Sequence, residues 1–424
     1  MNNKHFFIKF FNSIILIFSI IISIPFISVA DDISSEEPIN VNSEIIQTSS
    51  TYDGTLSQQN LNSRSCIVLD RTSKQIIYGK NEYNKVKMAS TTKIMTAIIV
   101  IEQANLNDTI EISKKAAGTG GSRLGLKTGD KITINDLLYG LMLCSGNDAA
   151  VALAEGLAGS VPDFANLMNI KTQKLGLSNT HFESPHGLDS DGHYTTAYEL
   201  ALLSDYALKN PIFLKIVGTK NYTISINGYT KTLSNTNELL GNLDGIYGIK
   251  TGFTNGANRC LVTACKRGDM DIICVVLGAD TKKYRTQDSI KLIEYTFNNF
   301  EYINIENIIN EQFETWKNEN INSIDIQKSI PNNIELSFSK PEYSNIPVKK
   351  DHSPNIDISI NIKANLSAPI YKDSTIGTIT VSISDNPISL TSEIIVNSDI
   401  RKKDFIYYFL DFFKILPNVL AQSI

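Results

Sequence analysis

The strongest constraint on this chain is a Ser-x-x-Lys pattern, Ser90 to Lys93, that leads directly into the apolar run Ile94 to Ile101. Apolar residues in this run recur at helical spacing, which predicts a buried helix. Residues i and i+3 lie on one face of a helix, so the Ser90 hydroxyl and the Lys93 amine can meet at its start. A serine that acts as a nucleophile at neutral pH needs a neighbouring base. An amine in a dry pocket near another cation can be that base, because both conditions lower the pKa of an amine.

Taken alone, the Ser-x-x-Lys pattern is a weak signal. It fits a helix cap at Ser90 followed by a surface lysine better than it fits a catalytic pair. The pattern also occurs from Ser337 to Lys340, among alternating residues that run into Pro341. We interpret this second copy as accidental, because a proline at that point prevents a helix from following. The case for a catalytic serine therefore depends on the rest of the chain.

The N-terminus has the pattern of a secretory signal. Lys4 and Lys9 precede the apolar run Ile14 to Ile27, which ends in the small residues Ser28-Val29-Ala30. This arrangement predicts a signal peptide over residues 1–30 that is removed after Ala30. The alternative is an uncleaved membrane anchor. Cleavage would give an exported protein at the outer face of the cytoplasmic membrane or in the cell wall, on the periplasmic side.

Composition argues against several classes of function. The formal net charge is −5, and no basic cluster stands out in the folded region, so nucleic acid is not an expected partner. The five cysteines are an odd number in apolar contexts, which predicts buried free thiols and not a disulfide scaffold. Neither the cysteines nor the histidines from His181 to His193 have the spacing of metal ligands, so we expect no metal and no cofactor.

The first part of the mature chain has two sections. Residues 31–62 are rich in Ser, Asn, Gln and Glu, and we expect a flexible lead-in there. Residues 63–300 form the candidate catalytic domain. It begins with two short strands, Cys66–Leu69 and Gln75–Tyr78, which predict a hairpin. Helical patterns at 164–175, 196–208 and 290–297 follow.

The C-terminal part has a different pattern. Residues 301–400 show much alternation and no long helical period, which predicts a separate all-β domain. Residues 401–424 predict an amphipathic helix that runs until Pro417. The longest uncharged run in it is too short to span a bilayer, but three basic residues precede it, so it could lie in a membrane interface. The alternative is a helix packed on its own domain.

A polar interruption divides the apolar helical stretch Asn135–Gly159. It consists of Cys144-Ser145-Gly146-Asn147-Asp148. A glycine inside a helix lowers helix stability by about 1 kcal/mol, so the interruption needs a reason. Exposure of its polar residues to a cleft would supply one. An inter-helical turn with Asn147 as a cap explains the pattern equally well.

A third polar motif, Lys250-Thr251-Gly252, lies beside two predicted strands at 260–264 and 272–277. On a strand that faces a cleft, these residues suit an anionic substrate. Lysine supplies charge, threonine a directed hydrogen bond, and glycine a close approach of two backbones. A second copy, Lys127 to Asp130, lies in a polar turn, and we interpret it as a turn only.

The three motifs, in this order, resemble those of the low-molecular-mass penicillin-binding proteins that are serine-type D-Ala-D-Ala carboxypeptidases. The resemblance runs from about Ser65 to the C-terminus. It implies an α/β (α+β) fold like that of the β-lactamases and transpeptidases, with an antiparallel sheet and a helical subdomain. The strings that carry it are Ala89–Thr96, Leu143–Ala149, Pro185–Leu188, Asp244–Gly252, Ala368–Ile370 and Ile376–Ile379.

The resemblance also implies the chemistry of the first two motifs. Ser90 would be the acylated nucleophile and Lys93 its base. Ser145 would relay protons, and Asn147 would hold the substrate amide. The substrate would be a peptidoglycan pentapeptide stem that ends in D-Ala-D-Ala, and β-lactam antibiotics would acylate the same serine.

The third motif would hold the end of the substrate. By resemblance, Lys250 and Thr251 receive its terminal carboxylate, with Gly252 between the two backbones. The backbone N–H groups of Ser90 and Phe253 would form the oxyanion hole. Arg285 falls where the family often has an arginine that serves the same carboxylate.

The chain departs from the family pattern in three places. Met88 replaces the usual proline before Ala-Ser, a change that we expect to be harmless. Phe253 stands where some members have histidine, which would alter rate or specificity. Three additional residues, Gly245-Ile246-Tyr247, imply a local difference in how the third-motif strand approaches the site.

Two other functions fit parts of this pattern. A β-lactamase must deacylate quickly and in class A uses a glutamate in a Glu-x-x-Leu-Asn loop. The nearest string here, Glu238 to Asn242, has glycine where that leucine stands. A non-catalytic wall-binding scaffold on the same fold would be signalled by loss of Ser90 or Lys93, and both are present.

Overall fold

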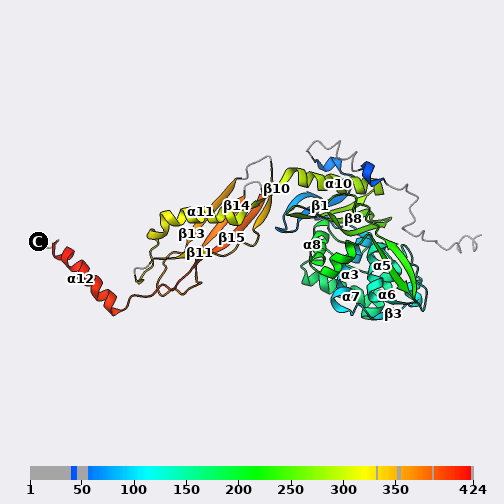
Figure 1. Cartoon of the computed structure of the whole chain (residues 1–424), viewed down its shortest axis with the longest axis horizontal. Coiled ribbons are helices and arrows are strands. Elements are labelled where there is room, and N and C mark those ends of the chain that lie inside the picture. Colours follow the sequence, from blue (N-terminus) through cyan, green and yellow to red (C-terminus); the bar gives the residue numbers. More distant parts are fainter. Residues whose placement is uncertain (1–39, 45–55, 331–332, 351–354, 384–385, 422–424) are drawn as a thin grey trace, which may run out of the picture.

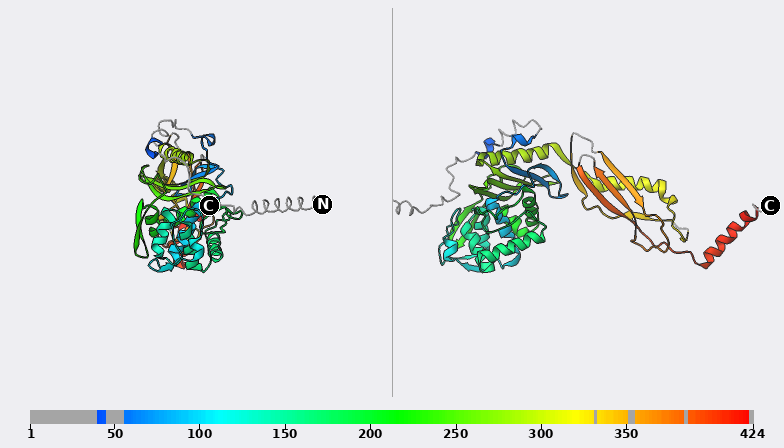
Figure 2. Two further views of the ribbon diagram at one scale, coloured as in Figure 1. Left: turned by 90° about the vertical axis from the view of Figure 1, so that its right-hand side faces the viewer. Right: turned by 180° about the vertical axis from the view of Figure 1, so that it is seen from behind.

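The computed structural model describes residues 40–44, 56–330, 333–350, 355–383 and 386–421. The predicted signal peptide therefore lies outside the described residues. Two lobes follow one another along the long axis of the molecule (Figure 1). The N-terminal lobe comprises residues 56–299 and the C-terminal lobe residues 300–404. A last helix extends beyond them (Figure 2).

The N-terminal lobe is built on a five-stranded sheet in which every neighbouring pair of strands is antiparallel. The predicted hairpin is confirmed, because the first two strands pair with each other. In spatial order the strands are β2 (Ile76–Lys80), β1 (Ser65–Asp70), β9 (Met270–Ala279), β8 (Asn258–Arg267) and β7 (Ile246–Thr254). The strand that carries Lys250-Thr251-Gly252 is thus at one edge of the sheet.

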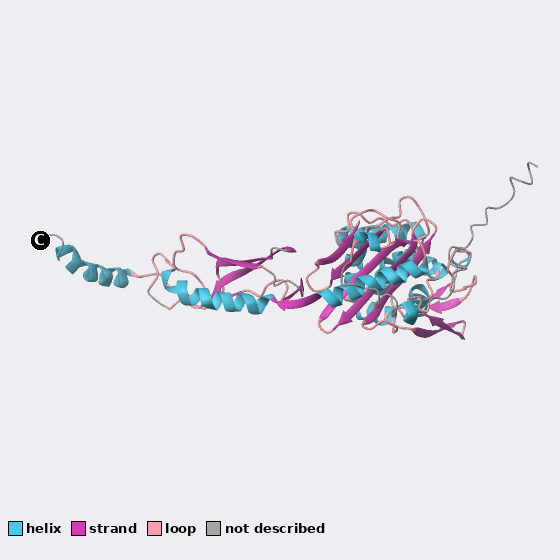
Figure 3. Cartoon of the chain, turned by 90° about the horizontal axis from the view of Figure 1, so that it is seen from above, coloured by secondary structure: helices cyan, strands magenta, loops and turns pink. Residues whose placement is uncertain are grey.

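Both faces of this sheet are buried, because successive side chains of a strand point to opposite faces. On β8, Val262 belongs to the core on one face and Leu261 to the core on the other. One face is covered by α10 (Lys282–Asn299) and the other by the helical subdomain (Figures 1 and 3). That subdomain contains α3 (Lys93–Gln103), α5 (Ile134–Leu143), α6 (Asn147–Ala158), α7 (Val161–Lys174), α8 (Ala197–Leu208) and α9 (Pro211–Val217).

Helix α3 is the centre of the subdomain. Residues Lys93 to Ile101 are all buried, so the helix is surrounded by protein on every side. A 3-10 turn, η2 (Ala89–Thr92), leads into it and carries Ser90. The helix predicted after the Ser-x-x-Lys pattern is therefore confirmed.

Shorter elements complete the lobe. Two small antiparallel strand pairs and a short helix lie beside the larger helices, and a 3-10 turn lies near the start of the lobe. Their bounds are β3 (Thr109–Glu111) with β4 (Lys131–Thr133), β5 (Asn221–Ile226) with β6 (Tyr229–Ser234), α4 (Lys114–Ala117) and η1 (Gln58–Asn60).

The described parts of the predicted lead-in contact the N-terminal lobe. Val41 and Leu61 are buried in the core between the sheet and α10. The carboxylate of Glu44 accepts a hydrogen bond from Gln287 and lies 3.2 Å from the Lys283 ammonium. These apolar positions are isolated among polar residues, so composition alone did not indicate that they are buried.

The C-terminal lobe contains a four-stranded antiparallel sheet with the order β11-β15-β14-β13 and a two-stranded pair, β10 with β12. A hydrogen bond from Tyr302 to Asp70 joins this lobe to the N-terminal lobe. The strands are β10 (Phe300–Asn304), β11 (Leu336–Phe338), β12 (Asn345–Lys349), β13 (Ile356–Ile362), β14 (Thr375–Ile383) and β15 (Asn386–Val396). The accidental Ser-x-x-Lys copy at Ser337 begins in β11 and opens no helix.

The prediction of a C-terminal domain without helices was wrong in one respect. A long helix, α11 (Ile305–Asn320), packs along the sheet and is followed by the 3-10 turn η3 (Ile321–Ser323). Its buried residues are Ile305, Ile309 and Phe313. This spacing of four is helical, but three positions among many polar residues made a weak pattern.

The last helix, α12 (Phe405–Ala421), continues past Pro417, so the predicted end at that proline was wrong. Proline removes one backbone hydrogen bond and tends to kink a helix, but it does not always end one. The side chains from Phe405 to Phe413 lie largely in solvent, with Phe405 81% exposed and Phe412 58% exposed. Within the described residues, no helix has both the length and the apolar character needed to cross a bilayer.

Candidate active site

Ser90 and Lys93 lie in contact at the start of α3. The Lys93 ammonium donates to the Ser90 hydroxyl over 2.7 Å, to the Asn147 side-chain oxygen over 2.8 Å and to the His186 carbonyl over 2.8 Å. Lys93 has no exposed surface, and Ser90 is 7% exposed. A buried amine that touches the serine can exchange a proton with it without an intervening water.

The turn that presents Ser90 is held in an uncommon conformation. Ala89 has a φ of 49°, in the left-handed region that costs a residue with a Cβ about 1 kcal/mol or more. The Ala89 carbonyl accepts a hydrogen bond from the Thr92 hydroxyl at 2.8 Å. Gly187 approaches the same carbonyl so closely that an added Cβ would lie 2.0 Å from its oxygen. These contacts fix the backbone that carries Ser90.

His193 completes this support, and its tautomer follows from its partners. The Thr92 hydroxyl donates to Ala89, so it accepts from Nε2 of His193 at 2.7 Å. Nδ1 of His193 accepts from the backbone N–H of Glu183 at 3.0 Å. Burial lowers the pKa of His193 to about 4, which keeps the ring neutral with its proton on Nε2.

A second histidine, His186, lies beside Lys93. Burial, followed by the positive charge of Lys93, lowers the pKa of His186 to about 3. The ring is therefore neutral at physiological pH. Its Nδ1 accepts a hydrogen bond from the backbone N–H of Leu188 at 3.2 Å, and its carbonyl receives Lys93. His186 thus acts on the site through its backbone.

Ser145 and Asn147 lie between α5 and α6. Ser145 has a φ of 62° and is 5% exposed, and its hydroxyl makes no hydrogen bond within the described part of the chain. Buried polar groups are seldom left without a partner, so one that is invites a functional explanation. Asn147 is held from both ends, since its oxygen accepts from Lys93 and its NH₂ donates to the Gly120 carbonyl over 2.8 Å. The interruption is a turn between two helices, but the prediction of Asn147 as its cap was wrong, because Gly146 occupies the N-cap position of α6 and no side chain caps the helix.

Asp148 explains why the turn is rigid. Its carboxylate accepts the backbone N–H groups of Leu124, Gly125 and Leu126 at 2.7, 2.7 and 3.0 Å. It has no exposed surface. The loop at 124–126 is thereby fixed to the first turn of α6, next to Asn147.

The third motif lies on β7 and runs past Ser90. A Cβ added to Gly252 would lie 3.1 Å from the Ser90 backbone nitrogen, so a side chain here would crowd the turn that carries Ser90. Lys250 is 1% exposed, and its ammonium donates to the Thr251 carbonyl over 3.0 Å. The Thr251 hydroxyl lies 2.7 Å from that of Thr236. Ser90 and the third motif, separated by about 160 positions in the sequence, therefore meet.

Phe253 follows on the same strand and is partly exposed. The guanidinium of Arg259, directly opposite in the β7–β8 pair, lies 3.6 Å from the centre of its ring. Asp189 holds the end of the strand, because its carboxylate accepts from the Thr254 hydroxyl and the Gly256 N–H at 2.7 and 2.8 Å. The strand that would orient a substrate is thus supported at its exposed end.

Arg285 is engaged by a partner that the sequence did not suggest. Its guanidinium is ion-paired with Glu238, which also accepts from the Thr286 hydroxyl. Arg285 is 4% exposed, and its Nε has no hydrogen-bond partner among the described residues. The nearby arginine helps to hold the pKa of Glu238 below its usual value, against the opposing effect of burial.

One short segment, Thr236 to Glu238, connects the parts of the site. The backbone N–H of Thr236 donates to the Leu143 carbonyl over 3.1 Å, two residues before Ser145. Its hydroxyl contacts Thr251, and Glu238 holds Arg285. Pattern analysis considered Glu238 only as part of a β-lactamase-like string. No local signal identified this segment, because the contacts that connect it to the site are with residues distant in sequence.

The arrangement combines the parts that acyl transfer requires. A serine hydroxyl contacts a buried amine, and a second hydroxyl, with no partner among the described residues, lies in the turn beside Asn147. A lysine and a threonine lie on the strand that passes Ser90. Among the described residues, no group of three or more His, Cys, Asp or Glu side chains is placed to hold a metal ion. This fold and site define a serine acyl-transfer enzyme of the penicillin-binding class.

Comparison with known proteins identifies the family. Residues 53–281 match the family described as D-alanyl-D-alanine carboxypeptidase, and residues 315–402 match the C-terminal domain of penicillin-binding protein 5. The first match covers more than half of the chain. The chain therefore belongs to the D-alanyl-D-alanine carboxypeptidase family and is a serine hydrolase of the peptidase S11 type.

Individual relatives agree. DacF of Bacillus subtilis is 33% identical over 351 residues, which cover 81% of this chain and 87% of that protein. DacC of Escherichia coli is 31% identical over 356 residues, covering 80% and 85%. Among solved structures, penicillin-binding protein 5 from Haemophilus influenzae aligns with a TM-score of 0.65 at 26% identity, over 82% of this chain and 100% of that chain. The Streptomyces K15 DD-transpeptidase aligns with a TM-score of 0.55 at 34% identity, over 57% and 100%.

Proposed function

We propose that this protein removes the terminal D-alanine from peptidoglycan pentapeptide stems through an acyl-enzyme on Ser90. The observation that carries the proposal is the 2.7 Å contact between Lys93 and Ser90 inside a buried site that also contains Asn147. In the reactive state the neutral Lys93 amine takes the Ser90 proton as Oγ attacks the carbonyl carbon of the penultimate D-alanine. The backbone N–H groups of Ser90 and Phe253 receive the developing oxyanion.

Breakdown of the tetrahedral intermediate needs a proton on the leaving nitrogen. Ser145 relays this proton, and its hydroxyl has no competing hydrogen bond among the described residues. Asn147 holds the substrate amide, and Lys250 and Thr251 receive the terminal carboxylate. Free D-alanine departs, and water then hydrolyses the ester to restore Ser90. Penicillins form the same ester, which hydrolyses slowly.

Arg285 contributes through the third motif in this proposal. Its pairing with Glu238 fixes the segment that contacts Thr251, and its positive charge adds to that of Lys250. The same pairing argues against a β-lactamase, because Glu238 is engaged by Arg285 and Thr286 and is not available to activate a deacylating water. The assembled contact of Ser90 with Lys93 argues against a non-catalytic scaffold.

The placement of the domains follows from this function. We assign the catalytic domain to residues 63–300, the β-rich domain to 301–400 and a membrane-associating helix to 401–424. Helix α12 presents exposed Phe405, Phe409 and Phe413, and Arg401 to Lys403 precede it, which suits the interface of an anionic membrane. The mature protein would then act at the outer face of the cytoplasmic membrane, after removal of residues 1–30.

The test is D-alanine release from a pentapeptide ending in D-Ala-D-Ala by the mature protein. Ser90→Ala should abolish both release and labelling by a fluorescent penicillin. Ser337→Ala, in the second Ser-x-x-Lys copy, is the matched control and should retain both. Release that persists in Ser90→Ala would overturn the assignment of the nucleophile.

A further inference from the structure

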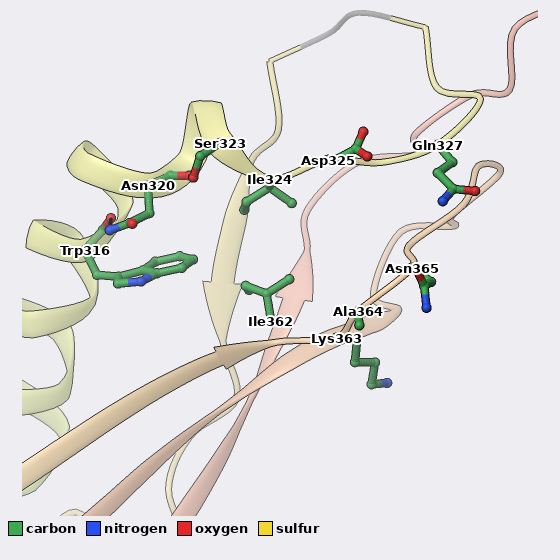
Figure 4. Close-up of a pocket in the computed structure, with 10 residues that line it drawn as sticks. All are labelled: Trp316, Asn320, Ser323, Ile324, Asp325, Gln327, Ile362, Lys363, Ala364 and Asn365. Carbon is green, nitrogen blue, oxygen red and sulfur yellow. Dashed lines mark hydrogen bonds between the residues drawn. The ribbon is translucent and has the colours of Figure 1, made fainter.

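The C-terminal lobe contains a cavity that the proposed reaction does not use. It has a volume of about 380 Å³ and lies where the end of α11 meets the loop after β13 (Figure 4). This is the end of the lobe that lies farther from the N-terminal lobe (Figure 1). Cavities of a few hundred Å³ are of the size that holds small ligands or single units of a polymer.

The inner wall of the cavity is apolar. Ile324 and Ile362 point toward one another in Figure 4, and the Trp316 indole lies beside them. Trp316 is the only tryptophan of the chain and is partly buried. Its ring stacks on that of Phe313, with 6.0 Å between centroids and 8° between planes. Because Phe313 is buried, the indole is held in a fixed orientation.

The rim of the cavity is polar and rich in side-chain amides. Asn320 and Ser323 lie on the side of α11, and Gln327 and Asn365 on the opposite side. The side chains of Gln327 and Asn365 make no hydrogen bond with another described residue, so their amides can bind a ligand. Each amide offers two donors and an acceptor, which suits neighbouring hydroxyl groups.

The loops that carry these amides are fixed to each other through the backbone. The Gln327 N–H donates to the Leu366 carbonyl over 2.8 Å, and the Ala368 N–H donates to the Gln327 carbonyl over 2.9 Å. The rim is therefore pre-organised, which reduces the entropy that binding must overcome.

The charge of the cavity excludes a strongly ionic ligand. Its lining contains one acidic residue, Asp325, and one basic residue, Lys363. The Lys363 ammonium donates to the Thr375 carbonyl over 2.7 Å. A phosphate group needs clustered positive charge or several converging N–H donors, and a cationic ligand needs an excess of carboxylates. The ligand that fits is neutral, with one apolar face and several hydroxyl or amide groups.

We propose that this cavity binds a neutral saccharide, a unit of the glycan strand that carries the stem peptides. A sugar ring has an apolar C–H face that can stack on an indole and hydroxyl groups at its edge that can bond to amides. The choice of this glycan rests on the proposed function. Because the cavity lies far from Ser90, an extended polymer is the ligand that can engage both sites.

The sole tryptophan provides a direct test. The mature protein is titrated with the tetrasaccharide of N-acetylglucosamine while Trp316 emission is recorded. We expect a saturable change in emission. Substitution of both Gln327→Ala and Asn365→Ala should weaken binding about tenfold, the effect of two lost hydrogen bonds. The matched control substitutes two exposed asparagines on α11 and β13 that do not line the cavity, Asn318→Ala and Asn361→Ala, and should bind like the parent.

Each contrary outcome overturns the proposal. The first is that the tetrasaccharide causes no saturable change in emission. The second is that the Gln327/Asn365 variant binds it as tightly as the parent. The third is that a sugar-free stem peptide causes the same saturable change. A second readout separates this inference from the proposed function. The Gln327/Asn365 variant should release D-alanine from a soluble pentapeptide at the parental rate, but with a several-fold higher KM on intact glycan strands. If the parent protein released no D-alanine from the soluble peptide, the proposed function would be contradicted. The titration would still show whether the cavity binds the saccharide.

Discussion

The guanidinium of Arg285 is ion-paired with the carboxylate of Glu238, and both side chains are largely buried. The pair joins α10 to the segment that reaches Thr251 and the end of α5. An ion pair in such a place matters most when one partner is removed, because the other charge is then left buried without compensation.

Glu238→Ala should therefore destabilise the protein strongly. Loss of one partner of a buried pair costs about 3–5 kcal/mol of the free energy of unfolding. Urea denaturation of the N-terminal lobe would measure it, with the exposed Glu319→Ala as control. Replacement of both partners by leucine should recover part of the loss. An unchanged urea midpoint in Glu238→Ala would show that the pair does not stabilise this fold.

Ser145→Ala should separate catalysis from stability. The Ser145 hydroxyl makes no hydrogen bond among the described residues, so its removal should change the free energy of unfolding by less than about 1 kcal/mol. Loss of a proton relay should slow acylation by penicillin about 10²-fold or more. Ser204→Ala is the opposite control, because that buried hydroxyl donates to Leu200 far from the reacting groups. It should lose stability and keep its acylation rate.

Lys250→Ala should weaken recognition of the substrate carboxylate. A charge-assisted hydrogen bond contributes about 1.5–3 kcal/mol, which corresponds to a rise in KM of roughly 10-fold to 150-fold. Lys127→Ala, in the Lys-Thr-Gly copy that forms a turn, should have no effect. A peptide with a C-terminal amide gives an internal check, since the parent should discriminate against it and Lys250→Ala should not. If both proteins discriminated equally against the amide, the substrate carboxylate would be bound by residues other than Lys250.

Stability should fall as the pH is lowered below 6.5. Burial lowers the pKa of His193 from 6.5 to about 4 and that of His186 to about 3, so between these values the unfolded chain binds protons that the folded chain does not. The contribution of each neutral histidine to the free energy of unfolding is fully present above pH 6.5. Below this pH it falls by up to about 1.4 kcal/mol per pH unit for each histidine. Thermal unfolding from pH 7 to pH 4 would measure the slope, and His193→Gln should reduce it. If His193→Gln showed the same dependence of stability on pH as the parent, other titratable groups would be responsible for it.

Deletion of residues 405–424 should release the protein from membranes without loss of D-alanine release. This cut retains Arg401 and Lys403, whose backbones bond to Ile330 and Lys328 of the C-terminal lobe. Flotation with anionic phospholipid vesicles would measure binding, and Phe409→Asp with Phe413→Asp should mimic the deletion. Retention of the truncated protein on vesicles would place the membrane contact in another part of the chain.

The sequence predicted the site better than the parts that support it. The Ser90–Lys93 contact follows from helical spacing, and the β8 and β9 strands follow from local pattern. The long-range convergence of the three motifs came from resemblance, because no local rule brings residue 250 to residue 90. The structure places them in contact across β7 and η2.

The failures have a common physical cause. The buried side of α11 contains three apolar residues in a polar sequence, and Val41 is a single apolar position in a polar segment. The roles of His193, Asp148 and Glu238 depend on tertiary partners far away in sequence. A sequence pattern reveals periodicity and local chemistry, and none of these features has either.

All five thiols of the chain are free, and four of them are buried. Burial raises the pKa of Cys66 to about 12 and that of Cys260 to about 11, so these two carry almost no thiolate at neutral pH. Folding therefore requires no oxidation of cysteine, and oxidants have little access to the four buried thiols of the folded protein. Production of the mature chain in a reducing cytosol should yield the same fold as export, and alkylating reagents should modify the four buried thiols only after the protein unfolds.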